Sequence, residues 1–240
     1  MREVLALFGP TGVGKTAVAL ELADLLRERG EDPVAIGADA LQVYEGLGVL
    51  TGAATPQEQE TLEHRLVGVI PVTQKFDLGQ YMPLAHAEVD AALAAGRRPI
   101  VVGGTGLYMR GALANLSLRK DEDELWSAET RHPTLLFGLT MDREALYERV
   151  DRRTEAIVSA GAESEVRAAA AASVTARKAL GFDELRTGDV DALKKRSRNY
   201  ARRQLTWMRK MAGLREIDAT GRAPRDVAEE VLRILAAEAP

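Results

Sequence analysis

A chain of 240 residues, 46% of them hydrophobic, is long enough for one large domain or two small ones, and a globular enzyme is the expected class. It contains no cysteine, which excludes disulfides, thiolate metal sites and cysteine nucleophiles. The net charge of −4 argues against indiscriminate nucleic-acid binding, although local basic patches stay open. Because we find no signal-peptide pattern and no apolar run of membrane-spanning length, we expect a cytoplasmic protein without a membrane segment.

The N-terminal half alternates short apolar runs with amphipathic stretches, the rhythm of a parallel sheet covered by helices. This pattern predicts an α/β fold with a doubly wound, mostly parallel sheet and helices on both faces. The expected strands are 3–8, 33–38, 66–70 and 98–104, and the expected helices are 15–29 and 84–96.

The rhythm breaks after Leu118 in a charged, poorly periodic segment and then resumes. Asp142 is suited to cap the helix that follows the next strand. The expected elements are a strand at 134–140, helices at 143–158 and 189–211, a strand at 214–218 and a helix at 223–238. The predicted organisation is a first part of the core at 1–118, a shortened segment or hinge at 119–133, and a return to the core with C-terminal helices at 134–240.

The strongest motif is GPTGVGKT, which follows a strand and opens a helix. In this context backbone N–H groups and the helix N-terminus face phosphates, Lys15 reaches across them, and the Thr16 hydroxyl can bind Mg²⁺. The fold is therefore expected to be P-loop NTPase-like, but the motif does not say which phosphates it holds. The predicted phosphate-binding residues are Gly9, Pro10, Thr11, Gly12, Val13, Gly14, Lys15 and Thr16.

Two further motifs follow strands at the same edge of the sheet, where ligands bind in open α/β folds. GADALQVY places Asp39 there, as a Mg²⁺ ligand, a proton acceptor or only a turn cap. Gln42 has a two-sided amide that can read a base edge. GGTGLY either lets a chain or ligand approach closely and presents the Thr105 hydroxyl, or is only a tight strand-to-helix turn.

The stretch 194–210 carries eight basic residues and no acidic one. Arg196, Arg203 and Lys210 repeat every seven residues, so they share a helix face. A single-sign run on an acidic protein favours a surface that faces nucleic acid or diphosphate over an idle one. A neighbouring stripe is expected to be core; it consists of Tyr200, Gln204 and Trp207.

Arg149 and Arg153 lie four residues apart on one face of a predicted helix. Such a pair either clamps a diphosphate or forms ion pairs with Glu148 and Glu155 on the same helix. The sequence alone leaves both readings open.

Together these motifs resemble the tRNA dimethylallyltransferases, also called tRNA isopentenyltransferases. The matching stretches are GPTGVGKT, GADALQVY, HRLVGVIPVTQKFDLGQY, RPIVVGGTGLYMRGAL, SAGAESEVR, RKALGF and YARRQLTWMRK, in the family's order. The resemblance implies transfer of a dimethylallyl group from dimethylallyl diphosphate to N6 of adenosine 37, in tRNAs that read codons beginning with U. It also implies Mg²⁺ as cofactor, the tRNA anticodon stem-loop as partner, and a monomer.

The resemblance also implies a role for individual residues. Asp39 is the implied general base at the adenine N6, and Thr105 helps to orient it. Thr16 is the implied Mg²⁺ ligand, while Lys15 and Arg153 neutralise the leaving diphosphate. With two arginines of the basic helix, the implied tRNA-binding residues are Asp39, Ala40, Leu41, Gln42, Arg177, Lys178, Ala179, Leu180, Gly181, Phe182, Arg196 and Arg203.

The sequence departs from the family in two places. The helical insertion that grips the anticodon stem is largely absent, since only residues 117–132 stand there, and the family's GYRQ reads GFDEL. The short insertion favours a rival, an adenylate isopentenyltransferase that acts on a free nucleotide, whereas the basic helix favours tRNA. Two other rivals are an ATP-dependent small-molecule kinase, which lacks a convincing Walker B carboxylate here, and a catalytically idle nucleotide-binding regulator.

Overall fold

The computed structural model describes residues 3–117 and 125–238. Six strands form one sheet in the order β3-β2-β4-β1-β5-β6, and every neighbouring pair is parallel. The strands are β1 Val4–Phe8, β2 Pro33–Gly37, β3 His64–Arg65, β4 Arg98–Gly103, β5 Thr134–Thr140 and β6 Arg215–Asp218. The predicted parallel α/β fold is confirmed.

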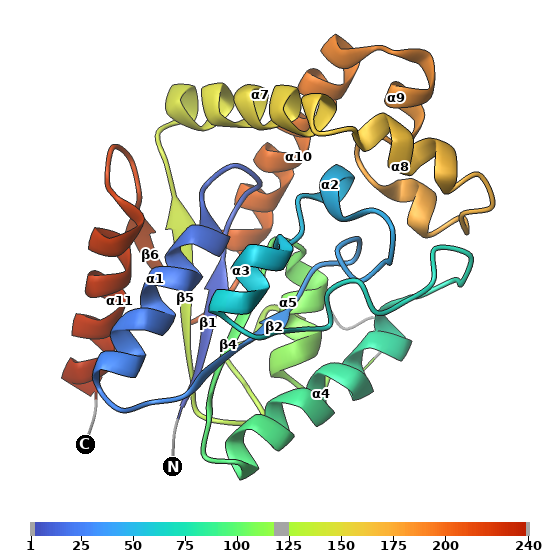
Figure 1. Ribbon diagram of the computed structural model, residues 1–240. Helices are drawn as coiled ribbons and strands as arrows, with labels where there is room; N and C mark the ends of the chain where they lie inside the picture. The colour runs from blue at the N-terminus through green and yellow to red at the C-terminus, as the bar shows by residue number, and fades with distance from the viewer. Residues whose placement is uncertain (1–2, 118–124, 239–240) are drawn as a thin grey trace.

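Helices alternate with the strands along the chain, and several consecutive helices lie between β5 and β6. They are α1 Lys15–Glu28, α2 Gly48–Thr51, α3 Pro56–Thr61, α4 Leu78–Ala94, α5 Gly106–Leu113, α7 Arg143–Ser159, α8 Ala162–Ala168, the 3-10 helix η1 Ala176–Lys178, α9 Phe182–Thr187, α10 Val190–Met208 and α11 Pro224–Glu238. Figure 1 shows α7 lying across the end of the sheet toward which β5 points, with α8 and α9 beyond it. This cap of helices stands over the carboxyl ends of the strands.

Side chains of the strands alternate between two apolar cores, as the period of two along a strand requires. On β1, Leu5 and Leu7 join the core that contains α1 and α11. Val4, Ala6 and Phe8 join the opposite core, with α4, α5 and the helices of the cap. Figure 1 shows α1 and α11 side by side on one face. Both faces of the sheet are therefore covered, which confirms the doubly wound class.

The predicted strand 66–70 is wrong. The strand at this edge is β3, two residues long, and ends at Arg65. Leu66 and Gly68 have left-handed backbone conformations, with φ of 59° and 61°, which turn the chain out of an extended path. Ile70 makes only an isolated parallel bridge with Tyr44.

The helix predicted for 84–96 begins earlier, at Leu78, because a capping box starts it. The Asp77 side chain accepts from the Gln80 backbone N–H, and the Gln80 side chain reaches back to the backbone of Asp77. Pro83 lies inside this helix, which continues through it to Ala94.

Asp142 caps α7 as predicted, since its carboxylate accepts from the backbone N–H groups of Glu144 and Ala145. Residues 119–124 of the predicted hinge lie outside the described residues. The rest of that segment is fixed by Arg110, which is buried in α5 and donates to the carbonyl oxygens of Leu125 and Glu129. Within residues 3–117 and 125–238, none of the helices combines the length and apolarity that crossing a membrane requires.

Candidate active site

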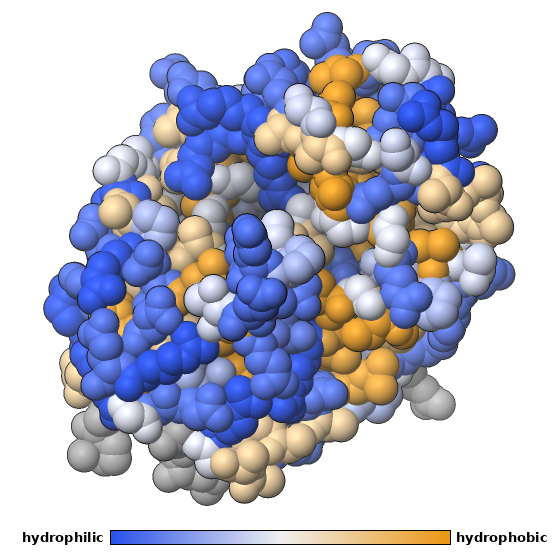
Figure 2. Space-filling model, in the orientation of Figure 1, coloured by the Kyte–Doolittle hydropathy of each residue, from blue (hydrophilic) through white to orange (hydrophobic). Residues whose placement is uncertain are grey.

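A cavity of about 560 Å³ opens where the carboxyl ends of β1, β2 and β4 meet α7 and α10. Figure 2 shows a hollow at this place, between α7 and α3, with mostly hydrophilic residues at its rim. Its lining includes the phosphate loop, Asp39, the glycines after β4, and side chains of α7 and α10. Three motifs that are far apart in the sequence therefore share one cavity, as their positions after parallel strands predict.

The phosphate loop owes its shape to glycine at two positions. Gly12 and Gly14 have φ of 85° and 103°, in the left-handed region, and Gly14 is the N-cap of α1. A Cβ on Gly12 would also come within 2.9 Å of the Val150 side chain on α7. Because α1 begins directly after this turn, its unpaired first-turn N–H groups provide an anion site at the cavity.

Lys15 is a cation without an acidic partner. Its ammonium donates to the carbonyl oxygens of Gly9 and Pro10, at 2.9 and 3.0 Å. It forms no ion pair with any carboxylate in the described part of the chain. Burial and the positive charge of Arg153 together lower the pKa of Lys15 to about 8, although the negative charge of Asp39 opposes both. A bound anion would relieve this uncompensated charge.

Arg153 reaches the same cavity from α7. Its guanidinium donates to the Thr11 hydroxyl at 3.2 Å and to the Thr51 carbonyl oxygen at 2.8 Å. A side chain at Gly52 would overlap this guanidinium. Burial lowers the pKa of Arg153, and Asp39 counteracts that shift. This second cation also lacks a carboxylate ion pair among residues 3–117 and 125–238.

The alternative reading of the α7 arginines, as partners of glutamates on the same helix, is not what the structure shows. Glu148 pairs with Arg152, and Glu155 pairs with Lys194 of α10. Arg149 lines the cavity beside the phosphate loop. Of the three α7 arginines that line the cavity, Arg149 and Arg153 have no carboxylate partner among the described residues and are left for a ligand.

Asp39 follows β2 and does two things at once. One carboxylate oxygen accepts from the Leu41 backbone N–H at 3.0 Å, which is the turn cap that the sequence allowed. The side chain also lines the cavity, and its charge acts on Lys15 and Arg153. The carboxylate is therefore oriented by its own turn toward the two cations.

The turn after β4 needs its first glycine, because a Cβ on Gly103 would overlap the carbonyl oxygen of Ala38. The predicted close approach at GGTGLY is confirmed. Thr105, at the N-cap of α5, accepts from the Ala40 N–H at 3.5 Å, and its hydroxyl lies 3.4 Å from the Tyr200 hydroxyl. The ends of β2 and β4 are thus joined beside Asp39.

Gln42 does not present a free amide. Its nitrogen donates to the carbonyl oxygens of Thr51 and Gly52, at 3.3 and 3.1 Å, which holds the end of α2 beside Arg153. In this arrangement the Gln42 side chain stabilises the cavity wall, and its amide nitrogen is not available to read the edge of a base.

The stripe on α10 that was expected to be core contributes to the site. Gln204 is 1% exposed and hydrogen-bonds both the phosphate loop and the turn after β4. Tyr200 lines the cavity, and its pKa is raised by burial and by the negative charge of Asp39. Trp207 packs with Trp126 against Gly106, at 3.2 and 3.4 Å from a Cβ position there. The helical spacing of these three residues predicted that they share one face of α10. It did not predict which polar groups of the fold lie opposite that face.

The stretch 177–182 is mostly structural in its contacts. Arg177 donates to the carbonyl oxygens of Ala170 and Ala172, and only Leu180 lines the cavity. Ala179 and Phe182 are buried, so we expect these two side chains to support the segment rather than to touch RNA.

The basic run on α10 divides into two halves. In the first half, Arg196 pairs with Glu184 at 2.7 Å, while Lys194 and Arg198 also have acidic partners. In the second half, Arg203 and Lys210 are exposed and lie over the rings of Tyr200 and Trp126. These two make no ion pair with a described residue, and in the first half Lys195 is likewise unpaired among the described residues, but it lies over no aromatic ring there.

The Thr16 hydroxyl and the Asp39 carboxylate line the same cavity. Among the residues that the structure describes, no group of three His, Cys, Asp or Glu side chains is placed to hold a metal by itself. A cation here would need most of its oxygen ligands from a bound phosphate group and water.

Comparison with known proteins identifies the family. The model of IPP transferase matches residues 42–132 and 117–211, and that of isopentenyl transferase matches residues 2–74. The two IPP transferase segments overlap at 117–132, the stretch in which we expect the insertion to be shortened. The division into 1–118, 119–133 and 134–240 stays a prediction.

Individual relatives agree. The chain is 30% identical to the tRNA dimethylallyltransferase of Streptococcus agalactiae over 267 residues, covering 86% of this chain and 88% of the relative. It is 30% identical to that of Kineococcus radiotolerans over 304 residues, covering 97% and 96%. Because 304 exceeds the 240 residues of this chain, the relative carries residues without a counterpart here.

A solved structure has the same fold over nearly the whole chain. The full-length tRNA isopentenylpyrophosphate transferase of Bacillus halodurans superposes with a TM-score of 0.85 at 25% identity, covering 99% of this chain and 96% of that one. Both the sequence and the fold lead to one conclusion: the chain belongs to the IPP transferase family, the family of the tRNA dimethylallyltransferases.

Proposed function

We propose that this protein transfers a dimethylallyl group from dimethylallyl diphosphate to N6 of adenosine 37, in tRNAs that read codons beginning with U, which gives N6-isopentenyladenosine. The observation that carries the proposal is that Lys15 and Arg153, which have no carboxylate ion pair among the described residues, share a cavity with the Asp39 carboxylate. Cations suit a departing diphosphate, and the carboxylate suits the proton of an amine. The tRNA dimethylallyltransferases among its relatives support the choice of donor and acceptor.

The phosphate loop would bind the diphosphate of the donor. First-turn N–H groups of α1, the Lys15 ammonium and the Arg153 guanidinium are the donors in place. As the allylic carbon–oxygen bond breaks, its electron pair leaves on the diphosphate oxygen. Charge develops there, so donors fixed in a partly buried site lower the barrier.

Asp39 would accept the proton of the acceptor. The adenine amine is a poor nucleophile, so positioning and proton removal have to supply much of the rate. The N6 lone pair forms a bond to C1 of the dimethylallyl group, and one N6 proton passes to the Asp39 carboxylate. Thr105, beside the same turn, would hydrogen-bond the base and orient it. The target base must leave its stack to reach this cavity.

Magnesium would bind at Thr16. Thr16 is the second residue of α1 and lines the cavity. A single protein hydroxyl suits Mg²⁺, because this ion usually keeps several water ligands and binds phosphate oxygens of the substrate. When bound, Mg²⁺ neutralises charge on the diphosphate. All the residues used in these steps come from one chain, and we propose that the enzyme acts as a monomer.

The second half of the basic run on α10 would hold the RNA. Arg203 and Lys210 are exposed, free of acidic partners among the described residues, and stacked over aromatic rings, which suits phosphates beside unpaired bases. Arg196 is neutralised by Glu184, so we expect it to contribute less.

The decisive experiment is transfer of labelled dimethylallyl groups, with Mg²⁺, to an anticodon stem-loop that carries adenosine at positions 36 to 38, and in parallel to AMP. Label on the stem-loop supports the proposal, and label on AMP alone would move the protein to the free-nucleotide branch. Arg203→Ala should raise the KM for the stem-loop several-fold, whereas the matched variant Arg196→Ala should change it little. Equal effects of the two would contradict the assignment of the RNA surface.

A further inference from the structure

Gln204 bridges two loops with a single amide. Its oxygen accepts from the Thr11 backbone N–H at 2.8 Å, and its nitrogen donates to the Gly104 carbonyl oxygen at 2.7 Å. Thr11 belongs to the phosphate loop after β1, and Gly104 to the turn after β4 that leads to Thr105. One side chain of α10 therefore touches the backbone on both sides of the proposed reaction.

The two loops have no other hydrogen-bonded link in the described residues. β1 and β4 are neighbours in the sheet, but their pairing ends at Phe8 and Gly103. Beyond that point one chain continues into the phosphate loop and the other into the turn that leads to Thr105. The Gln204 amide is hydrogen-bonded to both segments, so it holds the backbone at Thr11 and the backbone at Gly104 at a fixed separation.

The bridge has little freedom to move. Gln204 is 1% exposed, so breaking either bond leaves a buried polar group without a partner. A Cβ on Gly104 would overlap the Gln204 nitrogen and would lie 3.1 Å from the Gly9 carbonyl oxygen. Glycine at position 104 is therefore what allows the amide to approach. The Thr11 N–H is occupied by the amide and the Val13 N–H by the Pro10 carbonyl oxygen, so the N–H groups at the start of α1 are the ones that face phosphate.

We propose that Gln204 is a positioning residue for prenyl transfer, which fixes the distance between the diphosphate held by the loop at residues 9–16 and the acceptor base held at Thr105. The inference rests on the proposed function. A bimolecular transfer is sensitive to such a distance, since a displacement of about 1 Å can cost about 100-fold in rate. Each substrate can still bind to its own loop when the bridge is broken. The effect should therefore fall on kcat rather than on either KM.

The test begins with Gln204→Met, which keeps the length of the side chain and removes both hydrogen bonds. We expect kcat to fall about 10- to 100-fold, with the KM values for dimethylallyl diphosphate and for the anticodon stem-loop each within about threefold of wild type. Met208→Ala is the matched control, because Met208 is buried one turn along on α10 and packs near Gly138, away from both loops. It should lower the melting temperature and leave kcat within about twofold.

A second variant breaks the same bridge from the other side. Gly104→Ala should displace the amide and lower kcat to a similar extent. Gly104→Ala breaks the bridge and also crowds the Gly9 carbonyl oxygen, so the double variant should be no slower than Gly104→Ala alone, within about threefold.

Three outcomes would overturn the inference. They are a Gln204→Met enzyme with wild-type kcat, a defect confined to one KM, and kcat losses that multiply in the double variant. If the wild-type enzyme transferred no prenyl group to either acceptor, the proposed function would fail and the inference with it. If the wild-type enzyme is active and the Gln204→Met enzyme is equally active, the inference about Gln204 is wrong while the proposed function stands.

Discussion

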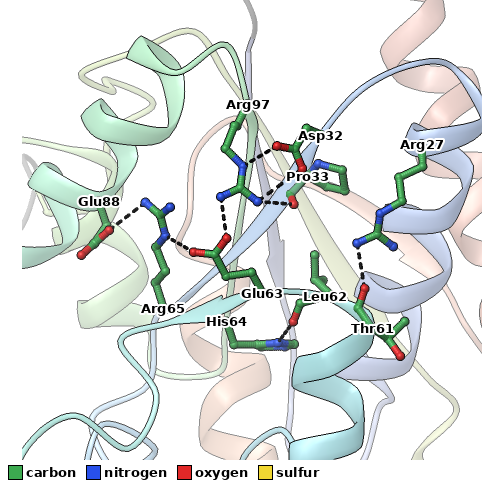
Figure 3. Close-up of polar contacts among 10 residues, drawn as sticks. All are labelled: Arg27, Asp32, Pro33, Thr61, Leu62, Glu63, His64, Arg65, Glu88 and Arg97. Atoms are coloured by element: carbon green, nitrogen blue, oxygen red, sulfur yellow. Dashed lines mark hydrogen bonds and ion pairs between the residues drawn. The ribbon is translucent and has the colours of Figure 1, made fainter.

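The two ends of the sheet use their cations in opposite ways. At the amino end, Arg97 forms ion pairs with Asp32 at 2.8 Å and Glu63 at 2.5 Å, and Arg65 pairs with Glu63 and Glu88 (Figure 3). At the carboxyl end, Lys15 and Arg153 reach only carbonyl and hydroxyl oxygens among the described residues. A cation that the fold has already neutralised supports the fold, whereas one left unpaired at a cavity is available to an anionic ligand.

The largest loss of activity is predicted for substitution of Asp39, the carboxylate whose charge acts on both Lys15 and Arg153. Asp39→Asn keeps an oxygen for the Leu41 N–H but cannot take a proton, so kcat should fall about 10²- to 10⁴-fold with little change in fold. Initial rates of stem-loop prenylation, with circular dichroism as a check of folding, measure this. A variant with more than a tenth of the wild-type kcat would remove Asp39 from the role of base.

Arg153→Gln should lower the enzyme's activity without lowering its thermal stability. The amide can still donate to the Thr51 carbonyl oxygen, but the charge that faces the diphosphate is gone, so kcat/KM should fall about 100-fold. The melting temperature should stay level or rise, because burial disfavours the charge of Arg153 in the folded protein. A large loss of stability would mean that Arg153 belongs with the structural cations instead.

The affinity for the donor should weaken in alkaline solution. The pKa of Lys15 is lowered to about 8, so above pH 8 the free enzyme increasingly lacks the charge that a diphosphate needs. We expect the Kd of dimethylallyl diphosphate to rise up to about tenfold per pH unit above pH 8 in calorimetry. Lys15→Met should bind weakly at every pH, without this dependence.

The same shift has the opposite sign for folding. A lysine with a folded pKa near 8 and an unfolded value of 10.5 binds more protons when unfolded between those pH values. Its contribution to stability therefore increases as the pH rises from about 8 to 10.5. A Lys15→Met variant should lose this increment, which denaturation at pH 8 and pH 10 can compare.

The smallest effect is expected at the amino end. Arg97→Gln removes two partly exposed ion pairs, and solvent screening limits their worth to about 1 kcal/mol of unfolding free energy. The melting temperature should drop by about 2–4 °C, while kcat and both KM values stay within about twofold. A catalytic defect in this variant would contradict the conclusion that the cations at the amino end of the sheet serve only the fold.

Sequence patterns were enough for the fold and for the cavity. The alternation of apolar runs predicted the parallel sheet, and the rule that ligands bind beyond the carboxyl ends of strands predicted that the phosphate loop, Asp39 and the glycines after β4 share a cavity. Thr105 does not line this cavity but lies beside it, where its hydroxyl accepts from the Ala40 N–H. Local capping chemistry was also readable, as at Asp142. The strand at 66–70 failed because an apolar run does not reveal a left-handed residue such as Leu66.

Pairings between distant residues were not readable. The sequence placed Arg196 and Arg203 on one face, yet only tertiary structure brings Glu184 to Arg196. Gln204 looked like part of an aromatic stripe, because its partners, Thr11 and Gly104, are main-chain groups 193 and 100 residues away. Periodicity identifies a face of a helix, but the polar groups across from it depend on the fold.

The packing at Gly106 also provides an intrinsic fluorescence signal. The chain contains two tryptophans, Trp126 and Trp207, and both lie against this glycine, one residue after Thr105. Intrinsic tryptophan emission therefore originates from residues packed beside the turn that carries Thr105. An anticodon loop arriving there should change this emission without any attached dye, so RNA binding can be followed by stopped-flow mixing separately from the loading of the donor.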